Sequence, residues 1–206
     1  MSWGSVRLKT AIVSCSDKTG LVDFCKRLGD AFQIYSTGGT TSTLREGGVK
    51  ARPISDLTNF PEILGGRVKT LHPKILGGIL ARAEADSKDI ERHGLTRIDL
   101  VVVNLYPFIE TASRVHDLSE AIEMIDIGGV TLIRAAAKNY RNVVVVTEPS
   151  DYGWVADSLS NGHDLSEGER LHLARKAFDY IARYDIAIAE YFESLEEKAA
   201  PHKAQG

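Results

Sequence analysis

The sequence predicts an α/β fold in which a mostly parallel central sheet carries helices on both faces and a helical segment closes the C-terminal end. Three observations predict it. Short apolar runs at 10–15, 98–103 and 142–147 have the length and composition of buried parallel strands. Polar loops rich in glycine or hydroxyl residues follow these strands, and helical patterns follow the loops. Strands that alternate with helices in this way are typical of parallel βα units.

One domain is expected over 1–196, with 197–206 as a disordered tail. The chain has 206 residues, 43% hydrophobic and 26% charged, which is enough for one α/β domain with a sizeable core. No internal repeat, low-complexity segment or linker divides it. The tail is polar, as terminal segments without a fixed structure often are.

The first predicted strand leads into a segment that suits an anion. Residues 10–15 are followed by the polar stretch 16–20 and by a helix whose apolar face begins at Leu21. A helix that begins directly after a strand offers free backbone N–H groups to an anion, and Lys18 adds a positive charge there. A capped helix with a solvated lysine explains the same residues, so this segment alone leaves both readings open.

The second predicted unit repeats the same order over residues 32–48. The apolar run 32–35 is followed by the small-residue loop 36–41 and by a helix expected over 42–46. Glycines and hydroxyls in such a loop let the backbone approach a phosphate closely. The loop matches neither G-x-x-x-x-G-K-[ST] nor G-x-G-x-x-G, which argues against nucleoside triphosphate and dinucleotide sites.

Residues 65–73, which read GGRVKTLHP, concentrate groups that bind anions. Two glycines precede Arg67, Lys69 and Thr70, so two cations and a hydroxyl lie within four residues. The alternation of apolar and polar side chains predicts an extended segment along a cleft wall, and the His-Pro pair is expected to prevent a helix from starting there. A basic surface turn is the alternative explanation.

The run 98–103 is the strongest strand pattern, and it leads to Asn104 and Tyr106. Ligands of open parallel sheets bind at the carboxyl ends of strands, so these two side chains stand where a site is expected, although packing explains them equally well. The other elements are predicted as a short strand over 49–54, a connecting loop over 56–61, a charged helix over 84–93, helices over 118–125 and 132–139, a helix from Pro149 to Leu159, and a long helical pattern over 166–196 that is interrupted near Tyr184.

Composition and spacing argue against several classes of function. The net charge of −3 and the scattered cations do not indicate a nucleic-acid-binding protein. The two cysteines and six histidines show no disulfide or metal-binding spacing, so neither a disulfide framework nor a metal centre is expected. The sequence has no signal-peptide pattern and no apolar run of about 18 residues, so no membrane association is expected and the cytoplasm is the expected compartment.

Six motifs in a fixed order resemble one known family. They are SCSDKTG at 14–20, STGGT at 36–40, GGRVKTLHP at 65–73, NLYPF at 104–108, DIGG at 126–129 and RAAAKN at 134–139. Together they resemble the inosine monophosphate (IMP) cyclohydrolase domain of the bifunctional purine-biosynthesis enzyme, over roughly residues 7–195. The resemblance implies the methylglyoxal-synthase-like fold, which agrees with the strand and helix alternation.

The resemblance stops before the formyltransferase domain that follows in the bifunctional enzyme. We therefore expect either a free-standing cyclohydrolase or an excised domain, with no folate cofactor. A homodimer is expected by analogy, and a separate formyltransferase is a candidate partner.

The activity that the resemblance implies is the last step of de novo purine biosynthesis. In this step 5-formamidoimidazole-4-carboxamide ribonucleotide closes its ring to IMP and loses water, so the expected partners are a purine ribonucleotide substrate and product. The reaction is internal to one substrate and needs positioning, a donor for a developing oxyanion and a route for protons. No metal or other cofactor is expected.

The resemblance also implies which residues carry the two ends of the substrate. The 5′-phosphate end is assigned to Ser14, Ser16, Lys18, Ser36, Thr37, Gly38, Gly39, Thr40, Arg67 and Thr70. The base end is assigned to Lys69, Asn104, Tyr106, Asp126, Gly128 and Lys138. We hypothesise that Lys69 and Lys138 stabilise the oxyanion, that Tyr106 relays a proton near Lys138, and that Asp126 orients the carboxamide and accepts its proton.

One pair of these residues raises a geometric problem. If residues 129–139 form one straight helix, Asp126 and Lys138 lie roughly 15 Å apart through it, at about 1.5 Å per residue. Either the helix is broken, the substrate spans the gap, or a second protomer contributes Lys138. Without the resemblance, Lys138 is equally well explained as a cation that stabilises a helix C-terminus.

Two functions of the same fold compete with the cyclohydrolase hypothesis. A regulatory purine-nucleotide-binding domain, like the allosteric domain of carbamoyl phosphate synthetase, needs the phosphate loop but not the four residues Lys69, Tyr106, Asp126 and Lys138 together. Methylglyoxal synthase uses an aspartate base and a histidine, and the motifs from 104 to 139 do not follow its pattern. A purely structural role leaves the six motifs unexplained.

Overall fold

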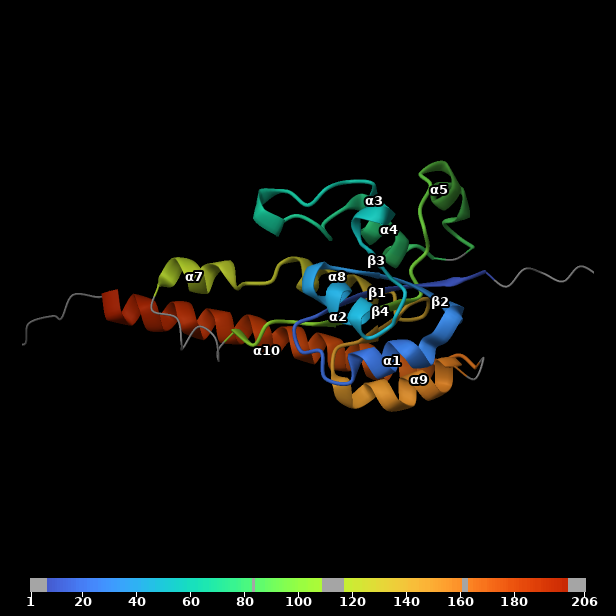
Figure 1. The fold of residues 1–206 in the computed structure, drawn as a ribbon. Coiled ribbons are helices and arrows are strands. Elements are labelled where there is room, and N and C mark those ends of the chain that lie inside the picture. The colour runs from blue at the N-terminus through green and yellow to red at the C-terminus, as the bar shows by residue number, and fades with distance from the viewer. Residues whose placement is uncertain (1–6, 83, 109–116, 161–162, 200–206) are drawn as a thin grey trace, which may run out of the picture.

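The computed structural model describes residues 7–82, 84–108, 117–160 and 163–199. Its centre is a five-stranded sheet in the order β3-β2-β1-β4-β5, and all neighbouring strands are parallel (Figure 1). The predicted α/β fold with a parallel sheet is therefore confirmed. The strands are β1 (Lys9–Cys15), β2 (Phe32–Ser36), β3 (Ala51–Pro53), β4 (Leu100–Asn104) and β5 (Val144–Val146).

The strand order brings the ends of β1 and β4 together at the middle of the sheet. In the register, Cys15 lies beside Asn104, the last residue of each strand. The middle residues of both strands are fully buried, because helices cover both faces of a parallel sheet and leave no side for polar residues. The strand order changes direction at β1, with β2 and β3 on one side of it and β4 and β5 on the other, so a ligand is expected to bind at the carboxyl ends of β1 and β4.

Helices cover both faces of the sheet. Those on one face include α1 and α9, which contact each other, while α4 contacts α8 on the opposite face (Figure 1). The described helices are α1 (Leu21–Leu28), α2 (Gly38–Glu46), α3 (Ser55–Thr58), α4 (Pro73–Leu80), α5 (Ser87–Arg92), α7 (Leu118–Glu123), α8 (Gly128–Lys138), α9 (Tyr152–Ser160) and α10 (Glu167–Ala199), with short 3-10 turns η1 (Gly29–Ala31), η2 (Leu64–Gly66) and η3 (Pro149–Asp151).

The prediction that His72-Pro73 prevents a helix from starting is wrong, because α4 begins at Pro73. His72 has an extended backbone, as expected before proline, and its Nδ1 accepts a hydrogen bond of 3.1 Å from the backbone N–H of Lys74. Proline is favoured at the first helical position, where its missing N–H costs nothing. The restriction before proline therefore places His72 as the N-cap instead of excluding a helix.

The helix α2 begins four residues earlier than predicted, at Gly38 instead of Ser42. Gly38 has a φ of 32°, and a Cβ on Gly38 or Gly39 would meet no atom within 4 Å. Most of the predicted small-residue loop is therefore the first turn of a helix, and its glycines lie open to solvent.

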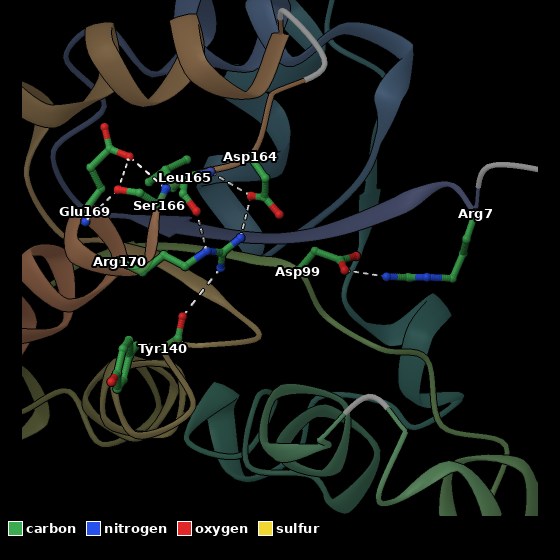
Figure 2. Close-up of polar contacts among 8 residues, drawn as sticks. All are labelled: Arg7, Asp99, Tyr140, Asp164, Leu165, Ser166, Glu169 and Arg170. Atoms are coloured by element: carbon green, nitrogen blue, oxygen red, sulfur yellow. Dashed lines mark hydrogen bonds and ion pairs between the residues drawn. The ribbon is translucent and has the colours of Figure 1, made fainter.

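The C-terminal helix α10 is continuous, so the predicted interruption near Tyr184 is wrong, and the helix continues to Ala199. Its start is fixed by a capping box. The Ser166 backbone N–H and hydroxyl both donate to the Glu169 carboxylate, and Glu169 N–H lies 3.3 Å from the Ser166 hydroxyl oxygen (Figure 2). Arg170 in the next turn donates to groups of three neighbouring residues, Tyr140, Asp164 and Leu165.

Further along, α10 is tied to the end of β5. The Lys176 ammonium contacts the Glu148 carboxylate at 2.7 Å and the buried Asp151 carboxylate at 2.6 Å. In Figure 1, α7 and the C-terminal part of α10 project from the same side of the sheet. These ties make α10 a fixed support for the segments that follow β4.

Candidate functional site

A pocket of about 700 Å³ opens beside the carboxyl ends of β1 and β4. It gathers seven of the residues assigned to substrate binding or catalysis. They are Ser14, Arg67, Lys69, Thr70, Tyr106, Asp126 and Gly128. The other walls come from residues 65–66, residues 122–129 and Leu132 in the first turns of α8. Residues as far apart in the sequence as Ser14 and Leu132 thus meet around one space.

The wall that carries Arg67 and Lys69 is a tight turn. Leu64, Gly65 and Gly66 have φ values of 54°, 65° and 90°, and Ile63 pairs with Val68 in an antiparallel bridge that closes the turn. The prediction of an extended segment is therefore wrong for the two glycines. A left-handed backbone favours glycine, and the exposed Leu64 adopts it at a steric cost that is typical of binding sites.

A second wall depends on the two glycines that begin α8. Asp126 Oδ1 accepts a 2.7 Å hydrogen bond from the Gly129 N–H, so the carboxylate caps the helix. A Cβ on Gly129 would lie 2.5 Å from Asp126 Oδ2, and a Cβ on Gly128 would lie 2.5 Å from Thr70 Oγ1. Both glycines are therefore needed to seat Asp126 and Thr70 against the N-terminus of α8, where the helix dipole favours negative charge.

Two tyrosines of α10 hold the segments that carry Asp126 and Tyr106. The Tyr184 hydroxyl accepts a hydrogen bond of 2.9 Å from Asp126 N–H, and the Tyr180 hydroxyl accepts one of 2.8 Å from Leu105 N–H. Burial raises the pKa of both tyrosines, so both stay neutral near physiological pH. Sequence reasoning missed them, although their i, i+4 spacing on a helix indicated a common face.

The cations of the pocket are in two different states. The Lys69 ammonium makes no hydrogen bond or ion pair with any described residue, and it is partly buried on the pocket wall. The Arg67 guanidinium forms an ion pair with Glu123, at the end of α7. Sequence reasoning also missed Glu123, which also lines the pocket.

The predicted phosphate loop approaches the pocket through Ser14. The hydroxyls of Ser14 and Thr37 lie 2.6 Å apart, which joins the end of β1 to the first turn of α2. Thr40 Oγ1 accepts a hydrogen bond from the Cys15 N–H and donates one to the Cys15 carbonyl. The hydroxyls of Ser36 and Thr41 also form a hydrogen bond, so Thr40 and Thr41 both hold the loop in place. The backbone of Gly38 and Gly39 at the helix N-terminus is then the part of the loop best suited to an anion.

Three assigned residues lie next to the pocket but not on its wall. Asn104 is 7% exposed, and its amide bonds both the N–H and the carbonyl of Asp17 at 2.8 Å, which fixes the loop after β1. Lys18 Nζ donates to the Ser16 carbonyl at 3.3 Å, so this loop folds back on itself. Asn104 positions the loop that carries Ser16 and Lys18.

Lys138 is far from the pocket. The helix α8 is unbroken from Gly128 to Lys138, which places its ends about 15 Å apart at about 1.5 Å per residue. The only α8 residues on the pocket wall are Gly128, Gly129 and Leu132, in the first turns, and Lys138 is exposed at the other end. Of the three explanations considered for its distance from Asp126, a broken helix is thereby removed.

Tyr106 separates the candidate pocket from a second one of about 580 Å³ between the ends of β4 and β5 and α10. Tyr106 is 48% exposed and lines both. The lining of the second pocket includes the aromatic side chains of Phe108, Tyr180 and Tyr184 and the assigned residue Asn104. A ring placed in this way can contact a ligand in the candidate pocket without leaving its position.

Among the described residues, no group of three or more histidine, cysteine, aspartate or glutamate side chains is arranged to hold a metal ion. No helix in the same residues combines the length and apolar composition that a membrane crossing requires.

Comparisons with known proteins agree with this geometry. A family model described as an MGS-like domain matches residues 20–131, and one described as the AICARFT/IMPCHase bienzyme matches residues 136–206. The crystal structure of ForH superposes with a TM-score of 0.80 at 36% sequence identity, over 90% of this chain and 97% of that chain. The chain therefore belongs to the MGS-like domain family, and its C-terminal third matches the AICARFT/IMPCHase bienzyme, as the order of its motifs predicted.

Proposed function

We propose that this chain is an IMP cyclohydrolase, which closes the ring of 5-formamidoimidazole-4-carboxamide ribonucleotide to give IMP and water. One observation carries the proposal. Lys69, Tyr106 and Asp126 share a pocket with the anion-binding groups of Ser14 and Arg67. Its volume of about 700 Å³ lies in the range of small-molecule sites.

Positioning accounts for much of the proposed catalysis. The carboxamide nitrogen and the formyl carbon belong to one molecule, so a site that holds them in contact makes the closure effectively unimolecular. Anchoring the phosphate near Arg67 and Thr70 fixes the distance from the ribose to the base. The base then reaches the side of the pocket that carries Lys69 and Asp126.

The chemical steps are a ring closure and a dehydration. A bond forms between the carboxamide nitrogen and the formyl carbon, the formyl oxygen gains negative charge, and one proton moves from that nitrogen to the oxygen. The carbon–oxygen bond then breaks, and water leaves with a proton from the former formamide nitrogen. Lys69, whose ammonium is unpaired among the described residues, is the proposed donor to the oxyanion.

Asp126 is the proposed acceptor of the carboxamide proton. Its Oδ1 is held by the Gly129 N–H, whereas Oδ2 accepts no hydrogen bond from any described residue and is the oxygen proposed to take the proton. Tyr106 is the proposed proton relay to the departing oxygen, because it lines the same pocket and is half exposed.

Lys138 requires a second protomer in this proposal. Since α8 is straight and only its first turns reach the pocket, we propose a homodimer in which the partner contributes Lys138 to the site. Mixing Lys69→Ala with Lys138→Ala chains tests it. If Lys138 acts across the dimer, random exchange of subunits restores about a quarter of wild-type activity. Half of the dimers are then mixed, and each mixed dimer has one of its two sites complete. No recovery in a mixture shown to contain mixed dimers rules out this arrangement.

The activity itself is tested by an ultraviolet assay that follows conversion of the formylated ribonucleotide to IMP by this chain alone. We expect turnover in the wild type, and a large loss in Lys69→Ala and Asp126→Asn with the fold retained. Tight IMP binding without turnover would instead support a regulatory nucleotide-binding domain. Neither turnover nor IMP binding would contradict both functions.

A further inference from the structure

The ion pair between Arg67 and Glu123 closes one side of the candidate pocket. Arg67 Nε lies 3.1 Å from Glu123 Oε2, and Arg67 Nη2 contacts Glu123 Oε1, so the contact is bidentate. Both side chains line the pocket and are 66% and 54% exposed. The hydrogen bonds between them raise the pKa of Arg67 and lower the pKa of Glu123, as expected when each side chain stabilises the charge of the other.

The carboxylate occupies one of the two edges through which the guanidinium can bind a phosphate with two hydrogen bonds. Arg binds carboxylate and phosphate with the same planar fork of N–H donors. While Glu123 holds Nε and Nη2, a ligand phosphate cannot take that edge. Glu123 is also the last residue of α7, and residues 124–129, which follow it and include Asp126, line the pocket. Glu123 is thus a competitor placed inside the binding site.

We propose that Glu123 is an internal competitor of the ligand phosphate, which occupies Arg67 until a phosphate displaces it. A phosphate with two negative charges competes well for the fork, and it gains the Ser14 and Thr70 hydroxyls at the same time. A nucleoside offers no anion, and a single carboxylate only replaces one carboxylate by another. Glu123 therefore weakens the binding of ligands that use Arg67, and it leaves the affinity for a nucleoside unchanged. The inference depends on the proposed function in one respect, because it assumes that the ligand of the pocket carries a phosphate.

The size of the effect follows from the exposure of the pair. Exposed ion pairs contribute little to stability because water screens them, so displacing Glu123 costs a phosphate ligand only about two- to fivefold in affinity. The effect is smaller at high salt for the same reason. A cost of this size leaves tight phosphate binding intact.

The test measures binding of three probes by isothermal titration calorimetry: IMP, inosine and inorganic phosphate. Glu123→Gln keeps the size of the side chain and removes its charge. The matched control is Glu120→Gln, which makes the same change on α7 at an exposed position that is not on the pocket wall. We expect Glu123→Gln to tighten IMP and phosphate about two- to fivefold and to leave inosine unchanged, and Glu120→Gln to have a clearly smaller effect.

A second comparison separates displacement of Arg67 from a general change in charge. In an Arg67→Ala background, Glu123→Gln should no longer tighten phosphate binding, because there is no guanidinium to release. If the two glutamine variants behave alike, or if the gain persists without Arg67, the inference is wrong. A chain that binds phosphate with this dependence on Glu123 but does not turn over the formylated ribonucleotide contradicts only the proposed function. A wild-type chain that binds neither phosphate nor IMP contradicts both.

Discussion

Gly129→Ala is the sharpest test of how the site is built. The added methyl group would lie 2.5 Å from Asp126 Oδ2 and 2.7 Å from Leu105 Cδ2. Both distances are far below van der Waals contact, so the carboxylate must move away from the N-terminus of α8. That movement breaks or stretches the 2.7 Å hydrogen bond from the residue 129 N–H to Asp126 Oδ1. The substitution thus displaces a proposed catalytic group without removing it.

Opposing contributions set the expected change in stability. Alanine is favoured over glycine inside a helix by about 1 kcal/mol. Loss of a helix cap costs about 1 kcal/mol, and overpacking a buried position costs about 1–3 kcal/mol. The net expectation is a loss of about 1–3 kcal/mol in the free energy of unfolding. Gly153→Ala in α9 is the matched control, because a Cβ there meets no atom within 4 Å, so a gain of about 0.4–1 kcal/mol is expected.

Urea unfolding followed by circular dichroism measures the stability of both variants, and the ultraviolet assay measures turnover. We expect Gly129→Ala to lower kcat at least about tenfold, which corresponds to about 1.4 kcal/mol of transition-state stabilisation. Gly153→Ala should keep wild-type turnover. If Gly129→Ala is as stable and as active as the wild type, the close contact between α8 and Asp126 is not part of the native structure, and this reasoning is refuted.

Three further predictions concern the support of the site and the core. Tyr184→Phe removes the hydroxyl that accepts a hydrogen bond from the Asp126 N–H, so it should lower the free energy of unfolding in urea by about 1–3 kcal/mol. It should also lower kcat more than it changes KM. Unchanged stability and kcat would contradict the role of Tyr184 in positioning Asp126. Lys176→Met leaves the buried Asp151 carboxylate without its cation and should cost about 3 kcal/mol, whereas an unchanged unfolding midpoint would show that the ion pair contributes nothing. Burial raises the pKa of Cys15 to about 11 and of Cys25 to about 12, so the unfolded chain loses thiol protons first. The free energy of unfolding is therefore expected to be at its full value below about pH 8.5, the usual pKa of a thiol, and to fall as the pH rises from there toward 11. Unfolding of the wild type and of a double Cys→Ser variant at each pH checks this, because the variant should lose less stability over the same pH range.

Local patterns in the sequence were enough to predict the architecture and the family. Apolar runs of strand length, each followed by a polar loop and a helix, indicate parallel βα units because strand burial and helix periodicity are properties of short segments. The same reasoning placed candidate residues at the ends of the first and fourth strands. Those ends do lie side by side, with Cys15 next to Asn104.

The errors arose where a local rule had two outcomes. His72-Pro73 was predicted to prevent a helix from starting. Proline is nevertheless favoured at the first position of a helix, and α4 begins at Pro73. The last helix was predicted to be interrupted near Tyr184. That helix stays continuous because its apolar face, including Ile181 and Tyr184, is buried against the rest of the domain.

The sequence by itself predicted the parallel sheet, the helices on both of its faces, and seven of the residues that line the pocket. Only the tertiary structure decided which of the predicted site residues meet: Lys69, Tyr106 and Asp126 share one pocket, while Lys138 lies about 15 Å along α8 from its start, at about 1.5 Å per residue. It also brought in Glu123 and Tyr184, whose roles depend on partners 56 and 58 positions away in the chain. Contacts at such separation are set by how whole helices pack on the sheet, and no local pattern carries that information.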